Sequence, residues 1–119
     1  MFNIKTNELG DIIVADEVIE TIAGLAAVDC YGLVGMVPHN IQSEITNILG
    51  IESIRKGVQV TDSDDGIIID VYVIVGYGIK ISQVAFNVMQ KVTYILENSG
   101  IHVAAVNVNV KGVRILKEK

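Results

Sequence analysis

Apolar and polar residues alternate along the middle of the chain with a period of two, the spacing typical of β-strands. Val58 and Val60 alternate with polar neighbours before a turn-forming segment, Asp62 to Gly66. A longer alternation follows, in which one side carries Ile67, Ile69, Val71, Val73 and Val75. This pattern predicts a β-hairpin with one long strand whose apolar side faces the core.

Two other segments place their apolar residues at helical spacing. The first begins at Asp16, a residue type suited to the N-cap, and extends to about Val28, with an apolar face of Val18, Ile19, Ile22, Ala23 and Ala26. The second covers residues 80 to about 98, with a stripe of Ile81, Val84, Ala85, Val88, Val92, Ile95 and Leu96. A less regular segment, Asn40 to Ile54, permits a short helix that ends at Gly50.

Three further segments read as strands: Gly10 to Ala15, Tyr31 to Val37, and His102 to Val110. Because the expected strands alternate rather than run solidly apolar, helices should cover only one face of the sheet. The sequence therefore predicts an α+β fold, a two-layer sandwich. A mixed or antiparallel sheet of about four strands should carry two main helices on one face.

The opposite side of the long strand is only half polar, because Ile68, Tyr72 and Ile74 accompany Asp70. In the last strand Asn107 and Asn109 point outward, away from Val106, Val108 and Val110. A half-apolar sheet face suggests a partner rather than water. We therefore expect self-association through this face or the neighbouring strand edge, with a candidate interaction surface of Ile68, Tyr72, Ile74, Asn107 and Asn109.

Length and charge narrow the class of protein. The 119 residues, half of them hydrophobic, fit one domain over residues 1–119, with a flexible tail at 114–119. The formal charge of −5 and the 5% aromatic content disfavour nucleic acid as a partner.

Cellular location is indicated by what the sequence lacks. A lone Cys30 fits a reducing cytosol, and no secretory signal is seen at the N-terminus. The most apolar stretch, Gly66 to Ile79, is shorter than the roughly 20 residues of a membrane-spanning helix. We expect a cytoplasmic protein without direct membrane insertion.

No pattern supports catalysis, a cofactor or a metal. His39 and His102 lack any metal-ligand spacing, and an ordinary packed or solvated role fits both better. Asp62, Asp64 and Asp65 precede a glycine as in a calcium loop, but the later ligand positions do not match, so a solvated hairpin turn fits better.

Two glycine motifs are also weak. Gly76-Tyr77-Gly78 lacks the third glycine and the acidic residue of a dinucleotide site, so a tight turn is the better interpretation. Gly32-Leu33-Val34-Gly35 has the letters of a KH-domain loop but no basic residue nearby. We therefore expect no enzyme.

Three stretches in a fixed order and spacing carry a family resemblance. The first joins residues 10–19 and 22–27 to Gly32-Leu33-Val34-Gly35-Met36, and the second joins Lys56-Gly57-Val58-Gln59-Val60 to Ile69-Asp70-Val71 and Tyr77-Gly78. The third joins Ile81-Ser82-Gln83-Val84-Ala85 to residues 106–113. Together they resemble the alkaline shock protein family, small bacterial proteins tied to envelope stress.

The resemblance implies a non-catalytic cytosolic protein that forms homo-oligomers or docks onto a membrane-anchored protein partner. Such a protein would be peripheral at the membrane only through that partner, and the resemblance transfers no catalytic residue. Two alternatives stay open at this stage. One is a small regulatory domain that binds nucleic acid or an acyl metabolite of lipid metabolism, and the other is an undetected hydrolase.

Overall fold

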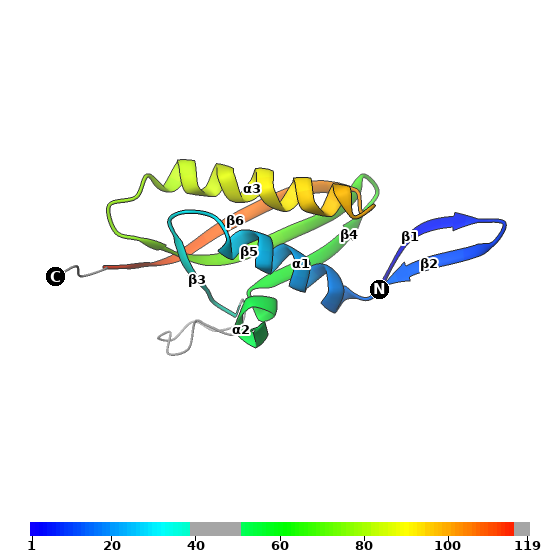
Figure 1. The fold of residues 1–119 in the computed structure, drawn as a ribbon, viewed down its shortest axis with the longest axis horizontal. Helices are drawn as coiled ribbons and strands as arrows, with labels where there is room; N and C mark the ends of the chain where they lie inside the picture. Colours follow the sequence, from blue (N-terminus) through cyan, green and yellow to red (C-terminus); the bar gives the residue numbers. More distant parts are fainter. Residues whose placement is uncertain (39–50, 116–119) are drawn as a thin grey trace.

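A four-stranded sheet is built around one central strand, β5 (Gly66–Gly76), in a computed structural model that describes residues 1–38 and 51–115 (Figure 1). Strand β6 (Val103–Arg114) pairs in parallel along one edge of β5. Strands β4 (Val58–Ser63) and β3 (Leu33–Met36) share the other edge end to end, both antiparallel. The sheet is therefore mixed, and the predicted α+β class is confirmed.

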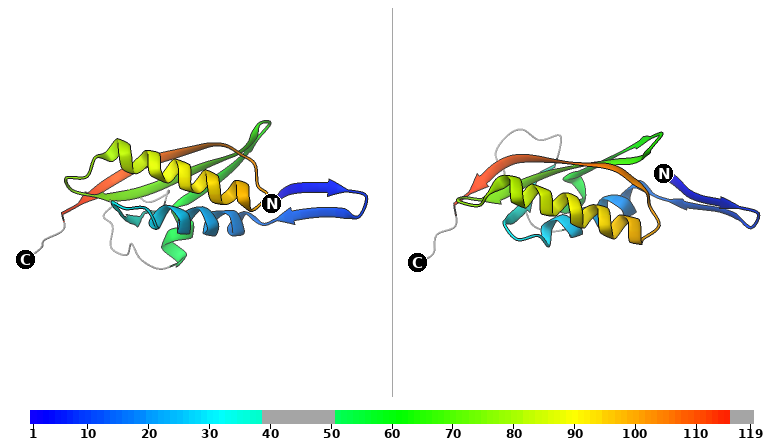
Figure 2. Two further views of the ribbon diagram at one scale, coloured as in Figure 1. Left: turned by 45° about the horizontal axis from the view of Figure 1, so that its top comes forward. Right: turned by 90° about the horizontal axis from the view of Figure 1, so that it is seen from above.

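The alternation in β5 sets the two layers of the domain. Its first side is buried throughout, at Ile67, Ile69, Val71, Val73 and Val75. Helices α1 (Asp16–Val28) and α3 (Ile81–Asn98) lie side by side against this side of the sheet (Figures 1 and 2). The predicted hairpin is confirmed, because β4 and β5 pair from Val58↔Val71 to Ser63↔Gly66.

The helix nearest the N-terminus buries a slightly different face from the predicted one. The buried residues of α1 are Ile19, Ala23, Gly24, Ala26 and Ala27, whereas Val18 is 47% exposed. The reason is α2 (Ile51–Lys56), which packs so closely that a Cβ on Gly24 would lie 2.4 Å from Ile54. In α3 the predicted stripe is buried at Val84, Val88, Val92 and Leu96, but Ile81 in the first turn is exposed.

The first residues of the chain form a strand that the sequence pattern did not predict. Strand β1 (Phe2–Asn7) pairs with β2 (Gly10–Val14) in a hairpin that projects from the rest of the domain (Figure 1). Asp16 is also not the N-cap of α1, because Ala15 occupies that position without a side-chain hydrogen bond. The Asp16 carboxylate instead forms an ion pair with the amino group of Met1, which ties the start of β1 to α1.

Two predicted boundaries differ at the ends of the described segments. The predicted helix from Asn40 lies mostly outside the described residues, and the described helix α2 begins at Ile51, after the expected stop at Gly50. Strand β6 continues past the predicted end at Val110 to Arg114, because it stays paired with β5 as far as Gly76. Within residues 1–38 and 51–115, no helix is both long and apolar enough to cross a membrane.

Candidate interaction surface

The second face of β5, turned away from α1 and α3, carries the residues predicted as an interaction surface. Ile68 and Tyr72 are half-buried on this face, and their neighbours in β6 are Ala105 and Asn109. Asn107 lies opposite Asp70 in the same register. The structure therefore brings Ile68, Tyr72, Asn107 and Asn109 together on one continuous surface.

Hydrogen bonds hold the polar side chains of this surface in place. Asn107 Nδ2 donates to Asp70 Oδ1 at 2.9 Å, which joins β6 to β5 across the surface. Asn109 Nδ2 donates to the Val71 carbonyl at 3.3 Å, and the Tyr72 hydroxyl donates to Gln59 Oε1 at 3.3 Å. Because these amides bridge neighbouring strands, the surface presents fixed rather than freely rotating polar groups.

Ile74 occupies a different setting from the rest of the predicted surface. Its side chain is only 5% exposed and packs against Val37 and the half-buried Val34. Val37 follows β3 and is held by a hydrogen bond from its backbone N–H to the Tyr72 carbonyl at 3.0 Å. This small apolar cluster shields Ile74, so a partner on this face would meet chiefly Ile68, Tyr72 and the asparagines.

The outer edge of β6 is a second place where a partner could bind. Strand β6 uses one edge to pair with β5, and no other strand of the described segments pairs with its opposite edge. An edge strand has backbone N–H and C=O groups that can accept a further strand. The edge adjoins Asn107 and Asn109, so the two features form one surface.

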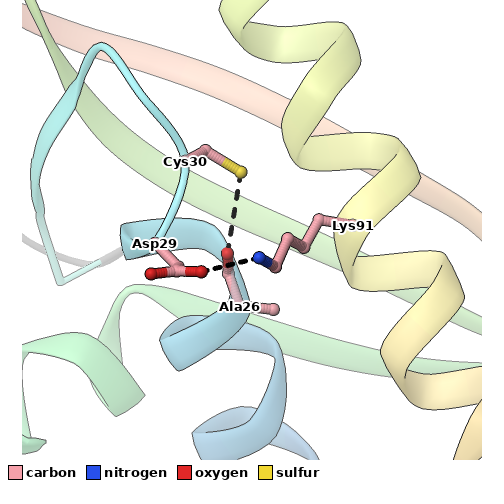
Figure 3. Close-up of polar contacts among 4 residues, drawn as sticks. All are labelled: Ala26, Asp29, Cys30 and Lys91. Carbon is pink, nitrogen blue, oxygen red and sulfur yellow. Dashed lines mark hydrogen bonds and ion pairs between the residues drawn. The ribbon is translucent and has the colours of Figure 1, made fainter.

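A polar cluster on the helix side was not predicted from the sequence (Figure 3). Lys91 Nζ in α3 lies 2.6 Å from Oδ2 of Asp29, the C-cap residue of α1. The hydrogen bond and the charge of Lys91 lower the pKa of Asp29, and the same contact raises the pKa of Lys91. Beside this pair the Cys30 thiol donates to the Ala26 carbonyl at 3.6 Å, and burial raises the pKa of Cys30.

This cluster borders an open hollow of about 630 Å³ between the two helices, lined by Asp29, Cys30, Tyr31, Asn87, Gln90, Lys91, Tyr94 and Ile95. Its charged groups, Asp29 and Lys91, are already paired with each other. The raised pKa of Cys30 keeps its thiol protonated and therefore weakly nucleophilic at neutral pH. The arrangement stabilises the contact between α1 and α3 and assembles no nucleophile with a base.

The other weak motifs occupy structural positions. Ser63 Oγ donates to the Gly66 carbonyl at 2.7 Å, so the acidic segment is a hairpin turn. Gly78 has a φ of +86° in the turn between β5 and α3. Gly32 has a φ of +93° just before β3, which then contains Gly35. Gly32 and Gly78 therefore lie in turns and Gly35 lies in a strand, so the structure gives both glycine motifs a structural role.

Of the two histidines, only His102 lies within the described residues. His102 is exposed and lies 3.0 Å from Glu97, whereas His39 is outside the described residues. Across residues 1–38 and 51–115, no three His, Cys, Asp or Glu side chains converge in a way that could hold a metal ion.

Comparison with known proteins places the chain in a family. Residues 4–115 match the model of the alkaline shock protein family, whose description reads "cell envelope-related function". The chain belongs to this family, which confirms the resemblance carried by its three sequence stretches. The family is bacterial, and its function relates to the cell envelope.

Relatives from two bacteria match along nearly their whole length. The uncharacterized protein YloU of Bacillus subtilis is 49% identical over 108 residues, which cover 89% of this chain and 90% of YloU. The uncharacterized protein Spy1614 of Streptococcus pyogenes is 37% identical, with 92% of each chain covered. YqhY of Bacillus subtilis is 36% identical, over 92% of this chain and 82% of YqhY. No solved structure gives a significant match.

Proposed function

We propose that this protein is a non-enzymatic, cytoplasmic interaction protein of the bacterial cell envelope. It associates with further copies of itself through the second face of the sheet and the adjoining outer edge of β6. It docks onto a membrane-anchored protein and is peripheral at the membrane through that partner. The proposal refines the envelope-related function of its family.

The observation that carries the proposal is the state of the sheet surface. Helices cover one face of β5, whereas Ile68 and Tyr72 on the other face are half-buried beside an edge strand of twelve residues. Asn107 and Asn109 fix this surface without covering it. Aromatic and aliphatic groups set among satisfied polar groups are typical of protein interfaces.

The charge of the chain supports a protein partner over a nucleic acid. With 14 acidic and 9 basic residues, the chain carries a formal charge of −5. Such a charge repels phosphate backbones, whose attraction to Lys and Arg supplies most non-specific affinity.

Self-association is tested by measuring molar mass by light scattering over a concentration series. A charge on the surface should disrupt it, so Ala105→Lys and Tyr72→Lys are expected to lower the mass of the wild-type assembly. Ala105 is exposed beside Ile68, so its lysine variant tests the surface without disturbing the core. Tyr31→Lys, an 82% exposed tyrosine on the helix side, is the matched control and should leave the mass unchanged. A wild-type monomer at every concentration would overturn this half of the proposal.

Docking is tested by sedimenting purified protein with native membrane vesicles. We expect co-sedimentation with untreated vesicles, and its loss when the vesicles are first shaved with protease. Binding to protein-free liposomes of the same lipids would show that the lipid, rather than a protein, holds the chain. That result, or a failure to sediment with any vesicle, would contradict docking onto a membrane-anchored protein.

A further inference from the structure

The two ends of the elongated molecule carry different and unpaired surfaces. The domain measures 60 × 25 × 22 Å along its principal axes. The β1–β2 hairpin forms one end, and the C-terminal end of β6 lies at the other (Figures 1 and 2). No single copy can therefore bring its own hairpin tip to its own β6 end.

The hairpin tip presents an exposed leucine between two acidic residues. Leu9, in the turn between β1 and β2, is 94% exposed. The turn is braced locally, because the Leu9 backbone N–H donates to Asn7 Oδ1 at 2.8 Å and Thr6 Oγ1 donates to Asp11 Oδ1 at 2.8 Å. Glu8 and Asp11 give this tip a formal charge of −2. Leu9 is thus an exposed apolar side chain with a negatively charged residue on each side of it in the sequence.

Within the described residues, the hairpin packs against the rest of the domain only through part of its apolar side chains. Phe2 and Ile4 pack against the hydrophobic core, but Ile12 and Ile13 are 51% and 57% exposed. A two-stranded hairpin with exposed faces is only marginally stable in water. Contact with a partner would supply the apolar packing that the outer half of the hairpin lacks.

The opposite end of the molecule has the complementary character. A hollow of about 390 Å³ is lined by Ile74, Gly112, Val113, Arg114 and Ile115. Gly112 lies opposite Ile74 in the sheet register, and Ile74 itself is only 5% exposed. Val113 and Ile115 are 51% and 66% exposed. Arg114 and the neighbouring exposed Lys111 make this end positive.

We propose that the hairpin tip of one copy binds in the hollow at the β6 end of the next copy. Leu9 would enter the hollow and contact the exposed side chains of Val113 and Ile115, while Glu8 and Asp11 approach Arg114 and Lys111. This inference rests on the proposed self-association and adds to it a second contact, between the ends of neighbouring copies. The contact joins two different surfaces, so it is head-to-tail, and repetition without ring closure gives an open chain of copies.

The first experiment measures the dissociation constant of self-association by sedimentation velocity. Leu9→Lys is expected to raise the constant at least about tenfold, because it removes the apolar side chain and places a positive charge against Arg114 and Lys111. Leu25→Lys is the matched control, since Leu25 is 44% exposed on α1, away from both ends. We expect the control to associate as the wild type does, and circular dichroism of both variants to match the wild type.

A charge exchange tests the direction of the contact. One variant carries a basic tip (Glu8→Lys, Asp11→Lys), and the other carries an acidic β6 end (Lys111→Glu, Arg114→Glu). Each variant alone places like charges at both of its ends and should lose the end-to-end contact. Mixed at equal concentration, each tip meets a hollow of opposite charge, so assemblies containing both variants should form.

The outcomes separate this inference from the function on which it rests. A wild-type protein that is monomeric throughout would overturn both. Assemblies that survive Leu9→Lys but are lost in Ala105→Lys would leave the proposed function standing and overturn the head-to-tail contact. Variants that stay apart when mixed, or a wild type that stops at a closed dimer, would also overturn it.

Discussion

Lys91 and Asp29 join the two helices of the domain, with the Lys91 Nζ and the Asp29 Oδ2 2.6 Å apart. Asp29 is the C-cap residue of α1, and Lys91 lies in the middle of α3, 62 residues further along the chain. Both side chains are exposed to solvent, at 68% for Asp29 and 40% for Lys91. The pair therefore orients the helices against each other without adding a buried charge.

The pair should make stability depend on pH in two directions. Lys91 lowers the pKa of Asp29 in the folded protein, so the stabilisation is complete above the ordinary Asp pKa of about 3.9 and is lost as the pH falls through the lowered value. Asp29 raises the pKa of Lys91, so that stabilisation is complete below about 10.4 and is lost as the pH rises through the raised value. Asp29→Asn should lower the urea midpoint slightly at pH 7.

The measurement is the difference in urea midpoint between wild type and Asp29→Asn at several pH values. We expect the difference to shrink as the pH falls below the ordinary Asp pKa of about 3.9 and through the lowered value, and to shrink in high salt at pH 7. Asp64→Asn, an exposed carboxylate in the β4–β5 turn, is the control and should show no such dependence. A difference that stays constant from pH 7 to pH 2 would show that the ion pair does not act as described.

The Cys30 thiol should react slowly with thiol reagents at neutral pH. Burial raises its pKa, and the nearby positive charge of Lys91 opposes that effect only in part. The rate of modification by a disulfide reagent, compared with that of a small free thiol, should therefore be lower at pH 8 and rise at higher pH. Lys91→Met should slow the reaction further, because it removes the charge that favours the thiolate. A rate at pH 8 equal to that of the free thiol would contradict this assignment.

Gly24→Ala should destabilise the fold, although alanine favours helix more than glycine does. A Cβ at Gly24 would lie 2.4 Å from Ile54 Cγ2 and 3.0 Å from the Ile54 carbonyl oxygen, so α1 and α2 would have to separate. Overpacking of this kind costs about 1–3 kcal/mol, which exceeds the roughly 1 kcal/mol gained in helix propensity. Thermal unfolding measures the Tm of Gly24→Ala, with Thr21→Ala as the control, and we expect the Tm of Gly24→Ala to fall. An unchanged or raised Tm for Gly24→Ala would refute the close contact.

Leu96→Ala should remove a main contact of α3 with the sheet. Leu96 is fully buried near the end of the helix, and truncation of such a leucine costs about 2–5 kcal/mol. Tyr94→Ala, two positions away and 66% exposed, should stay within about 0.5 kcal/mol of the wild type. Urea denaturation of the two variants compares the costs directly, and equal costs would mean that the two sides of α3 are not distinguished as the structure has them.

The parts of the fold that the sequence predicted are those with a long, regular hydrophobic period. The strand around Val71 and the helix around Val88 each repeat that period over many residues, so local pattern and tertiary burial agree. The β4–β5 hairpin was predictable for the same reason, since its turn residues separate two alternating runs.

The features that the sequence did not predict depend on contacts between distant residues. Asp16 looks like an N-cap locally, but the amino group of Met1 takes its carboxylate once β1 and β2 pair. Val18 has the correct spacing for the core, yet the close approach of α2 at Gly24 sets which side of α1 is buried. β1 itself offers only a short alternation of Phe2 and Ile4 among polar residues.

The candidate surface was predicted in part for the same physical reason. The alternation in β5 predicted that Ile68 and Tyr72 lie on the second face. The alternation in β6 predicted that Asn107 and Asn109 point outward, and the strand register places them beside Ile68 and Tyr72. It did not reveal that Val37 covers Ile74, or that Lys91 reaches Asp29, because neither contact is periodic. The hollow at the end of β6 also depends on register, since only the pairing of β5 with β6 brings Gly112 opposite Ile74.

Strands β3, β4 and β6 all pair with β5 and with no other strand in the described part of the chain. During synthesis on the ribosome, the segments that become β3 and β4 therefore have no strand to pair with until residues 66–76 have emerged. The sheet therefore forms late in synthesis, and it is complete only after β6 has left the exit tunnel.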